Sequence, residues 1–106
     1  METIRSKRDF EQVFTAGRRC GGKHVRLCVL RDPSRRGRVA FVAAKRLGNA
    51  VYRNRCKRVL REAARACDMP RAGADVILFA TRSTHEARPD AVAGELRRLL
   101  DQAHVS

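Results

Sequence analysis

The sequence has few aromatic residues and few acids. Its 106 residues include no Trp, one Tyr and four Phe, and 11 Asp and Glu stand against 24 Lys and Arg. The acids are too few to neutralise the basic residues within the chain, which leaves a net charge of +13 and indicates a polyanionic partner such as nucleic acid. An apolar content of 43% is that of a globular chain and excludes a disordered basic tail.

Long apolar runs are also missing. No run approaches the length that spans a membrane, and residues 1–9 are charged with no apolar segment after them. We therefore expect no membrane association and a cytoplasmic location. In that compartment the cysteines are expected to be reduced thiols, mostly packed in the interior. They are Cys20, Cys28, Cys56 and Cys67.

The sequence shows no metal motif and no catalytic constellation. The cysteines form no C-x-x-C pair, and no His spacing completes a zinc site. His24, His85 and His104 stand apart, without an accompanying carboxylate cluster or nucleophile. Asp75, Asp90 and Glu95 are expected at helix caps or on the surface. We expect no protein-held metal and no autonomous protein active site.

Residues 45–65 are at once helical in pattern, amphipathic and very basic. Apolar side chains recur at spacings of three and four, which predicts a helix with one buried face; they are Val51, Tyr52, Cys56, Val59, Leu60, Ala63, Ala64 and Cys67. A basic row recurs every fourth residue, at Arg53, Lys57, Arg61 and Arg65, and is widened by Arg55 and Arg58. Only Glu62 offers an opposite charge within the helix, so a polyanion is expected to neutralise this row.

The remaining elements give the order α-β-β-α-β-α. Ser6 and Gly17 bound a first helix, and the basic, Gly-rich residues 18–23 are interpreted as a loop. Strands are predicted over 25–30, 38–44 and 75–81, and a last helix begins at Pro89. The first two strands are expected to form a hairpin, with 38–44 central because it is apolar on both faces. This predicts a single α+β domain over 1–106, with helices packed on one sheet.

One stretch carries a family resemblance. Residues 44–58 read Ala-Lys-Arg-Leu-Gly-Asn-Ala-Val-Tyr-Arg-Asn-Arg-Cys-Lys-Arg. This resembles the Lys-Lys/Arg-x-Gly-x-Ala-Val-x-Arg-Asn-Arg-x-Lys-Arg signature of the bacterial ribonuclease P protein subunit. The likeness extends outward, because Asp9-Phe10, Val13-Phe14 and Gly17 match the first helix of that family and the predicted strands fall where its strands do.

The resemblance implies a protein partner of a catalytic RNA. In this family the RNA subunit removes the 5′ leader of precursor tRNA with bound Mg²⁺, and the protein holds the leader in a cleft between the first helix and the sheet. The family fold includes a left-handed β-α-β crossover, against the usual right-handed one. The resemblance therefore implies ribonuclease P RNA and precursor tRNA as partners, one protein per RNA, and Mg²⁺ bound mainly through the RNA. Family members often carry an aromatic where this chain has Cys28.

The resemblance also assigns residues to two surfaces. Phosphate contacts along the basic helix are expected from Lys45, Arg46, Arg53, Asn54, Arg55, Lys57, Arg58, Arg61 and Arg65, since Arg binds phosphate through two parallel hydrogen bonds. Leader contacts are expected from Phe10, Phe14 and Phe41, on which bases can stack. Periodicity alone would place Phe10 and Phe14 in the core, with Phe79 and Tyr52. Phe41 could belong to the floor of the cleft or to the core. Arg18, Arg19 and Lys23 form a basic patch with either an RNA or a solvent role.

Two other functions are compatible with parts of the sequence. A ribosomal or other structural RNA-binding protein would be equally basic, so composition does not distinguish it from a ribonuclease P subunit. A protein-only nuclease would need a cluster of acids or His residues, and the sequence offers no candidate for one. The protein subunit of ribonuclease P, an enzyme whose chemistry resides in RNA, is the function that the fifteen-residue match favours.

Overall fold

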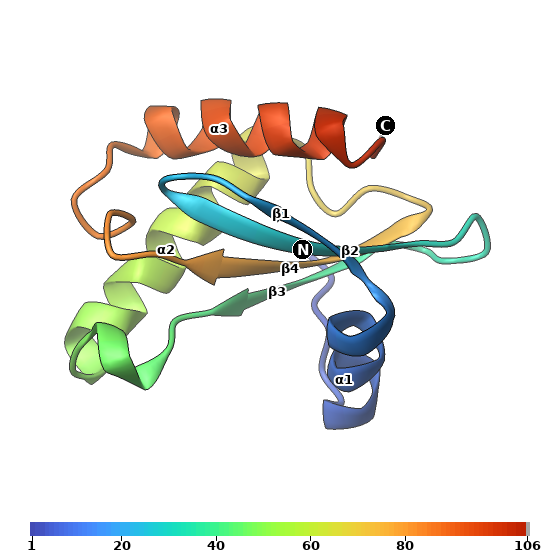
Figure 1. The fold of residues 1–106 in the computed structure, drawn as a ribbon, viewed down its shortest axis with the longest axis horizontal. Helices are drawn as coiled ribbons and strands as arrows, with labels where there is room; N and C mark the ends of the chain where they lie inside the picture. Colours follow the sequence, from blue (N-terminus) through green and yellow to red (C-terminus); the bar gives the residue numbers. More distant parts are fainter. Residues whose placement is uncertain (106) are drawn as a thin grey trace.

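A computed structural model describes residues 1–105 and contains the predicted elements in the predicted order (Figure 1). The helices are α1 (Lys7–Ala16), the short 3-10 turn η1 (Lys45–Leu47), α2 (Ala50–Ala66) and α3 (Pro89–Gln102). The strands are β1 (Arg18–Gly21), β2 (Val25–Arg31), β3 (Arg38–Val42) and β4 (Ala74–Ala80). The α+β class with helices on one sheet is confirmed. None of the helices within residues 1–105 is long and apolar enough to cross a membrane.

The strands form one mixed sheet in the order β1-β2-β4-β3. β4 pairs with β2 antiparallel and with β3 parallel, so the predicted β2–β3 hairpin is wrong. The reason is the burial of β4, whose first five residues, Ala74–Leu78, are all buried. A strand so apolar is most stable with both edges paired, and β2 and β3 each take one edge. The parallel β3–β4 pair requires a crossover, which α2 supplies.

Two edges of the sheet differ from the sequence-based expectation. Residues 18–21, interpreted as a loop, form β1 and pair antiparallel with β2. The side chains of β1 are mostly exposed and basic, so the sequence has no apolar alternation that would predict a strand. The strand forms through backbone hydrogen bonds, which do not require that alternation. β3, expected to be central, is at the other end of the sheet. The N-terminal segment continues beyond it, since Ile4 N–H donates to Val39 O at 2.8 Å and Val39 N–H donates to Glu2 O at 3.1 Å. The apolar residues on both faces of β3 therefore show that both of its faces are covered, and not that the strand is central in the sheet.

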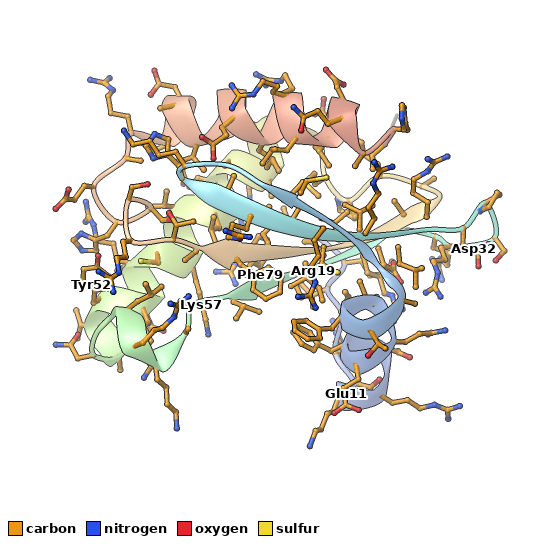
Figure 2. All side chains as sticks on the ribbon, viewed as in Figure 1. Glu11, Arg19, Asp32, Tyr52, Lys57 and Phe79 are labelled. Carbon is orange, nitrogen blue, oxygen red and sulfur yellow. The ribbon has the colours of Figure 1, made fainter. Side chains whose placement is uncertain are left out.

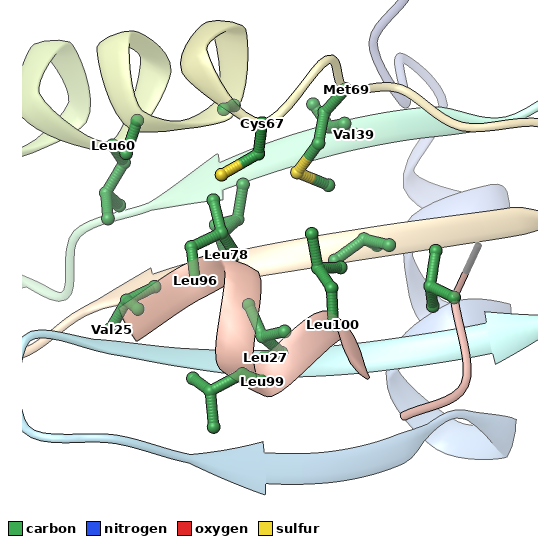
Figure 3. Close-up of a cluster of buried hydrophobic side chains, with 14 of the residues drawn as sticks. Val25, Leu27, Val39, Leu60, Cys67, Met69, Leu78, Leu96, Leu99 and Leu100 are labelled. Atoms are coloured by element: carbon green, nitrogen blue, oxygen red, sulfur yellow. The ribbon is translucent and has the colours of Figure 1, made fainter. Parts of the chain in front are cut away.

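One face of the sheet is closed by α2 and α3 (Figure 3). Side chains from the sheet, from α2 and from α3 meet there in the main core. It includes Val25, Leu27, Val39, Leu60, Cys67, Met69, Leu78, Leu96, Leu99 and Leu100. The buried acid Glu95 joins α3 to the sheet, because its Oε1 accepts the N–H groups of His24 and Val25 at 2.7 and 2.9 Å. Glu95 is therefore neither the helix cap nor the surface charge that the sequence predicted.

The other face of the sheet carries α1 alone. Val13 of α1 is fully buried against Cys28 and Ile77, and Ser6 caps the helix by accepting the N–H of Asp9 at 3.0 Å. A side chain at Gly17 would collide with Val13 O and Cys28 Sγ, so the end of α1 lies directly on β2. In Figure 1, α1 lies at one end of this face, and η1 with the start of α2 lies at the other. A hollow leaves the face between them partly open.

Arginines and acids fix the start of α1 to the sheet. Arg38 on β3 donates to Asp9 Oδ2 and to Asp75 Oδ2, both at 2.9 Å, and Arg35 donates to Asp75 Oδ2 at 2.8 Å. Asp75 is 1% exposed, so it is not the cap or surface charge that the sequence predicted. The hydrogen bond from Arg38 holds the pKa of Asp9 below its usual value.

Candidate RNA-binding site

The basic helix α2 has Asn49 as its N-cap. Asn49 Oδ1 accepts the N–H of Tyr52 at 2.9 Å, as its position before the helix predicted. A Cβ at Gly48 would lie 3.0–3.1 Å from atoms of Tyr52, so only glycine lets η1 turn this closely into α2. Cys56, Leu60, Ala63 and Ala64 form the buried side of α2. The polar side of the helix is thereby aimed away from the core.

The basic row of α2 winds around the helix. Residues four apart are offset by about 40°, so a row with this spacing drifts from one flank to another. Arg53, Lys57 and Arg61 are half-buried along the flank, and Arg65 is exposed. The Arg61 guanidinium lies 5.1 Å from the ring centroid of Phe41 on β3, which fixes the row beside the sheet. Figure 2 shows Lys57 on the side of α2 that faces β3 and η1.

A second set of polar residues is exposed. We call it the basic surface, and it consists of Lys45, Arg46, Asn54, Arg55, Arg58 and Arg65. Arg53, predicted to belong to this exposed arc, lies instead at its edge, since its Nε is buried without a hydrogen-bond partner. Phosphates could reach the exposed residues without any change of the helix. A substitution of Arg53, by contrast, would also alter packing.

A hollow of about 180 Å³ lies on the partly open face of the sheet. Its walls come from α1, β1 and η1 and its floor from β2, β3 and β4; the lining residues are Phe14, Arg19, Cys20, Arg26, Leu27, Val42, Ala44, Arg46, Phe79 and Ala80. Three of these are arginines and none is an acid. Figure 2 shows Arg19 and Phe79 together on the side of the sheet where α1 lies. The hollow thus combines aromatic surface with positive charge.

Phe14 is the centre of the aromatic group in this hollow. Its ring stacks on Phe10 at a centroid distance of 6.1 Å and meets the edge of Phe79 at 6.1 Å. The Arg19 guanidinium lies 4.3 Å from the Phe14 ring centroid, and its Nη2 donates to Phe14 O at 3.2 Å. Phe14 is nevertheless 39% exposed, which is unusual for a large apolar side chain. Arg19 and the aromatic rings can therefore present stacking surface and a cation at one point.

The three aromatics predicted to hold a leader do not share one surface. Phe14 lines the hollow, and Phe10 supports it from behind. Phe41 lies on the opposite face, under Arg61 and against the main core, which is one of its two expected places, so it does not line the hollow. Side chains alternate along a strand, and Val42, the next residue, is the one that reaches the hollow.

Other lining residues were missed in the sequence. Phe79, assigned to the core, lines the hollow, and its spacing of two from Ile77 was the signal that both share the α1 face. Arg26 gave no signal, because it reads as the polar member of an alternating strand. Cys28 does not reach the hollow at all. It is fully buried beneath α1, where its Sγ donates to Val13 O at 3.2 Å, so its difference from the family's aromatic affects the support of α1.

The buried thiols and the acids show no other chemistry. Burial raises the pKa of Cys28, Cys56 and Cys67, which keeps these thiols protonated and unreactive. Within residues 1–105, no group of three or more His, Cys, Asp or Glu is placed to hold a metal ion. The described residues therefore offer no cluster of acids for a protein-held Mg²⁺ ion.

Known proteins are similar to this chain in sequence and in fold. The family model described as ribonuclease P matches residues 1–104. The ribonuclease P protein component of Ruegeria pomeroyi is 38% identical, covering 99% of this chain and 88% of that protein, and that of Gluconacetobacter diazotrophicus is 36% identical, covering 96% and 90%. The Staphylococcus aureus RNase P protein superposes with a TM-score of 0.80 at 23% identity, over 99% of this chain and 97% of that one.

The Thermotoga maritima RNase P protein has the same fold, with a TM-score of 0.79 at 23% identity over 96% of this chain and 97% of that one. The match spans nearly the full length in every case, and it includes the basic helix and the strands that form the hollow. The structural-RNA alternative is not favoured by any of these relatives. The chain belongs to the ribonuclease P protein family, the protein subunit of the ribonucleoprotein that processes the 5′ ends of tRNA.

Proposed function

We propose that the two surfaces bind two different RNAs. The basic surface and the flanking row of α2, with Arg53, Lys57 and Arg61, dock on ribonuclease P RNA. The hollow beside α1 holds the single-stranded 5′ leader of precursor tRNA. The observation that carries this assignment is the exposed ring of Phe14 in a hollow that has three arginines and no acid in its lining.

The chemistry of the hollow suits a single strand of any sequence. Stacking of a base on an aromatic ring is worth about 1–3 kcal/mol and tolerates every base, because each base has a π face. Arg19, Arg26 and Arg46 supply the charge that phosphates between the bases require. Such contacts set position and affinity, and they carry little sequence information.

The basic surface suits a large folded RNA. Its arginines lie on α2 and, for Arg46, on η1 just before it, and each can bind a phosphate through two hydrogen bonds. Each phosphate contact releases condensed counterions, so affinity for the RNA subunit should fall steeply as salt rises. Arg46 lines the hollow and also belongs to the basic surface, which places the two binding surfaces side by side.

This arrangement predicts how precursor and product are distinguished. Precursor tRNA has a leader that fills the hollow, whereas mature tRNA has none, so binding energy is available only to the substrate. One protein per RNA subunit suffices for both contacts. Mg²⁺ is held by RNA in this scheme, and the protein assists by neutralising phosphate charge nearby. Assembly in the cytoplasm, where tRNA is processed, completes the proposal.

Reconstitution tests the function. The full-length protein is mixed with a bacterial ribonuclease P RNA and precursor tRNA at low Mg²⁺, and leader cleavage is compared with that by RNA alone. We expect faster cleavage and tighter binding of precursor than of mature tRNA. The absence of both gains would contradict the proposal.

Two variants then separate the surfaces. Arg55→Ala should weaken binding of the RNA subunit and lower the slope of log affinity against log salt by about 1. Phe14→Ala should weaken binding of precursor tRNA and leave RNA-subunit affinity nearly unchanged. Arg98→Ala is the matched control, since it removes one exposed charge from α3, on the far side of the sheet from α1. Equal behaviour of Arg55→Ala and Phe14→Ala in both assays would show that there is only one surface.

A further inference from the structure

Two rings are stacked face to face at the start of α2. The Tyr52 and His85 ring centroids are 4.0 Å apart, and the ring planes differ by 5°. Tyr52 belongs to the first turn of α2, and His85 to the loop between β4 and α3 (Figure 1). Figure 2 shows Tyr52 at the edge of the molecule where η1 and this loop meet. The stack is separate from the hollow and uses none of its lining residues.

The two rings of the stack have different neighbours. Gly48 lies against Tyr52 closely enough that an added Cβ would be 3.0 Å from the ring, so Tyr52 packs against both Gly48 and His85. His85 is only half-buried. The Tyr52–His85 pair forms a short column in which Tyr52 covers one face of the His85 ring, and the exposed part of His85 is available to a ligand.

The loop that carries His85 is held rigidly. The buried Thr84 donates its hydroxyl to His24 O at 2.6 Å, and Ser83 donates to Lys23 O at 2.7 Å. These bonds tie the loop to the turn between β1 and β2. A side chain fixed from both sides, by Tyr52 and by this loop, loses little conformational entropy when a ligand binds.

The surroundings of the column favour an RNA ligand. Arg55 follows Tyr52 by three residues, which places it one turn along the same side of α2. Arg82 is exposed in the same loop as His85, and Glu86 is the acid in that loop. Val51 is 75% exposed next to Tyr52, so apolar surface and positive charge meet here. An unpaired base with its phosphates complements this combination better than a helical RNA, whose bases are already stacked.

We propose that the outward face of His85 is a stacking site for an unpaired base of the ribonuclease P RNA. The RNA-docking surface then extends from α2 to the loop between β4 and α3. The base continues the column as its outermost layer, and Arg55 and Arg82 neutralise the adjoining phosphates. This site rests on the proposed docking of α2, because the same RNA must reach both.

Three substitutions at one position test the site. Equilibrium binding of the full-length protein to ribonuclease P RNA is measured at pH 8 over a range of salt. His85→Ala should weaken binding roughly 5- to 100-fold. The salt slope should stay unchanged, because stacking on a base makes no phosphate contact and releases no counterions. His85→Phe should bind like the unsubstituted protein, since it keeps an aromatic face on Tyr52.

Controls distinguish stacking from packing and from the docking of α2. His85→Leu fills the volume against Tyr52 without an aromatic face, so it should bind as weakly as His85→Ala. Full affinity in His85→Leu would show that His85 only supports α2 and would overturn the proposal. Wild-type affinity in His85→Ala, with weak binding in Arg55→Ala, would overturn the site and keep the docking surface. If neither variant weakens binding, the docking of α2 fails as well.

A further control removes a histidine elsewhere. His104 lies at the end of α3 with φ of 59°, a left-handed conformation that Asn tolerates. His104→Asn should therefore fold normally and bind RNA with unchanged affinity. A loss equal to that of His85→Ala would mean that the measured effect is not specific to the stack, and the site would be rejected.

Discussion

The two faces of the sheet are built on opposite plans. The face covered by α2 and α3 is closed, and leucines such as Leu60, Leu78 and Leu96 are fully buried in it. The face covered by α1 has a smaller core of Val13, Cys28 and Ile77, and beyond these residues it opens into the hollow. The same four strands thus supply both a closed core and the floor of an open hollow.

The difference predicts that stability depends on one face and that binding depends on the other. On the closed face the apolar side chains exclude water from one another, and their burial holds the fold together. On the open face Phe14 and Phe79 remain partly exposed, because α1 covers one end of the sheet and leaves the rest. Substitutions on the two faces should therefore change different measured quantities.

The largest expected effect is on the closed face. Leu78→Ala should lower the free energy of unfolding by about 2–5 kcal/mol, because it removes a fully buried side chain and leaves a cavity that the surroundings only partly fill. Urea denaturation followed by circular dichroism measures this change.

Val42→Ala is the matched substitution on the open face. Val42 is half-buried and borders the hollow, so its truncation should cost much less than that of Leu78. If Val42→Ala and Leu78→Ala lower the free energy of unfolding equally, the open face contributes as much to stability as the closed one.

Phe14→Ala should have the largest effect on binding. It removes the exposed ring at the centre of the hollow, and the affinity for precursor tRNA should fall by about 1–3 kcal/mol for each base that stacks there. Fluorescence titration of the reconstituted enzyme with labelled precursor measures this loss. Mature tRNA, which has no leader, should bind equally to the variant and to the unsubstituted protein.

Phe41→Ala is the control on the other face of the sheet. It deletes the ring under Arg61 and should lower stability, with precursor affinity retained. Arg19→Ala, alone and combined with Phe14→Ala, adds a double-mutant cycle. Because Arg19 lies on the Phe14 ring, the two losses of precursor affinity should not add. Additive losses of precursor affinity would mean that Arg19 and Phe14 contact the leader independently of each other.

A smaller effect is expected in cysteine reactivity. Cys20 is the half-buried cysteine and lines the hollow, whereas Cys28, Cys56 and Cys67 are buried with raised pKa values. A maleimide at neutral pH should therefore label one thiol per chain. Precursor tRNA should slow this labelling in the reconstituted enzyme, and mature tRNA should not. Equal rates with both tRNAs would show that the leader does not cover Cys20.

The sequence predicts the elements of this fold better than their pairing. Helical periodicity over residues 50–66 and alternation over 25–31 depend on neighbours in sequence, so both could be identified locally. The insertion of β4 between β2 and β3 could not, because it depends on how the connection through α2 returns to the sheet. β1 was missed for a different reason, since its partner is the backbone of β2 and its side chains are mostly exposed.

The candidate site also has one part that the sequence predicts and one that it does not. Cations on the exposed side of α2, such as Arg55 and Arg58, could be predicted, because helix geometry fixes which side is polar. The hollow depends on residues from six elements, and alternation along a strand decides which of them face it. Phe41 and Val42 are neighbours in sequence, yet only Val42 lines the hollow. The Tyr52–His85 stack joins residues 33 positions apart, which no local pattern indicates.

The smallest expected effect concerns the tie between α1 and the sheet. The hydrogen bond from Arg38 holds the pKa of Asp9 below 3.8 in the folded protein, so the unfolded state binds the proton more readily. The stabilisation from this pair is then present above pH 3.8 and is lost as the pH falls through the folded pKa. Asp9→Asn should lower the urea midpoint slightly at pH 7, and the difference from the unsubstituted protein should shrink to nothing in acid. A difference that persists at pH 2 would mean that the carboxylate charge of Asp9 does not fix α1, and that the wall of the hollow is held by the packing of Val13 on Cys28 and Ile77 alone.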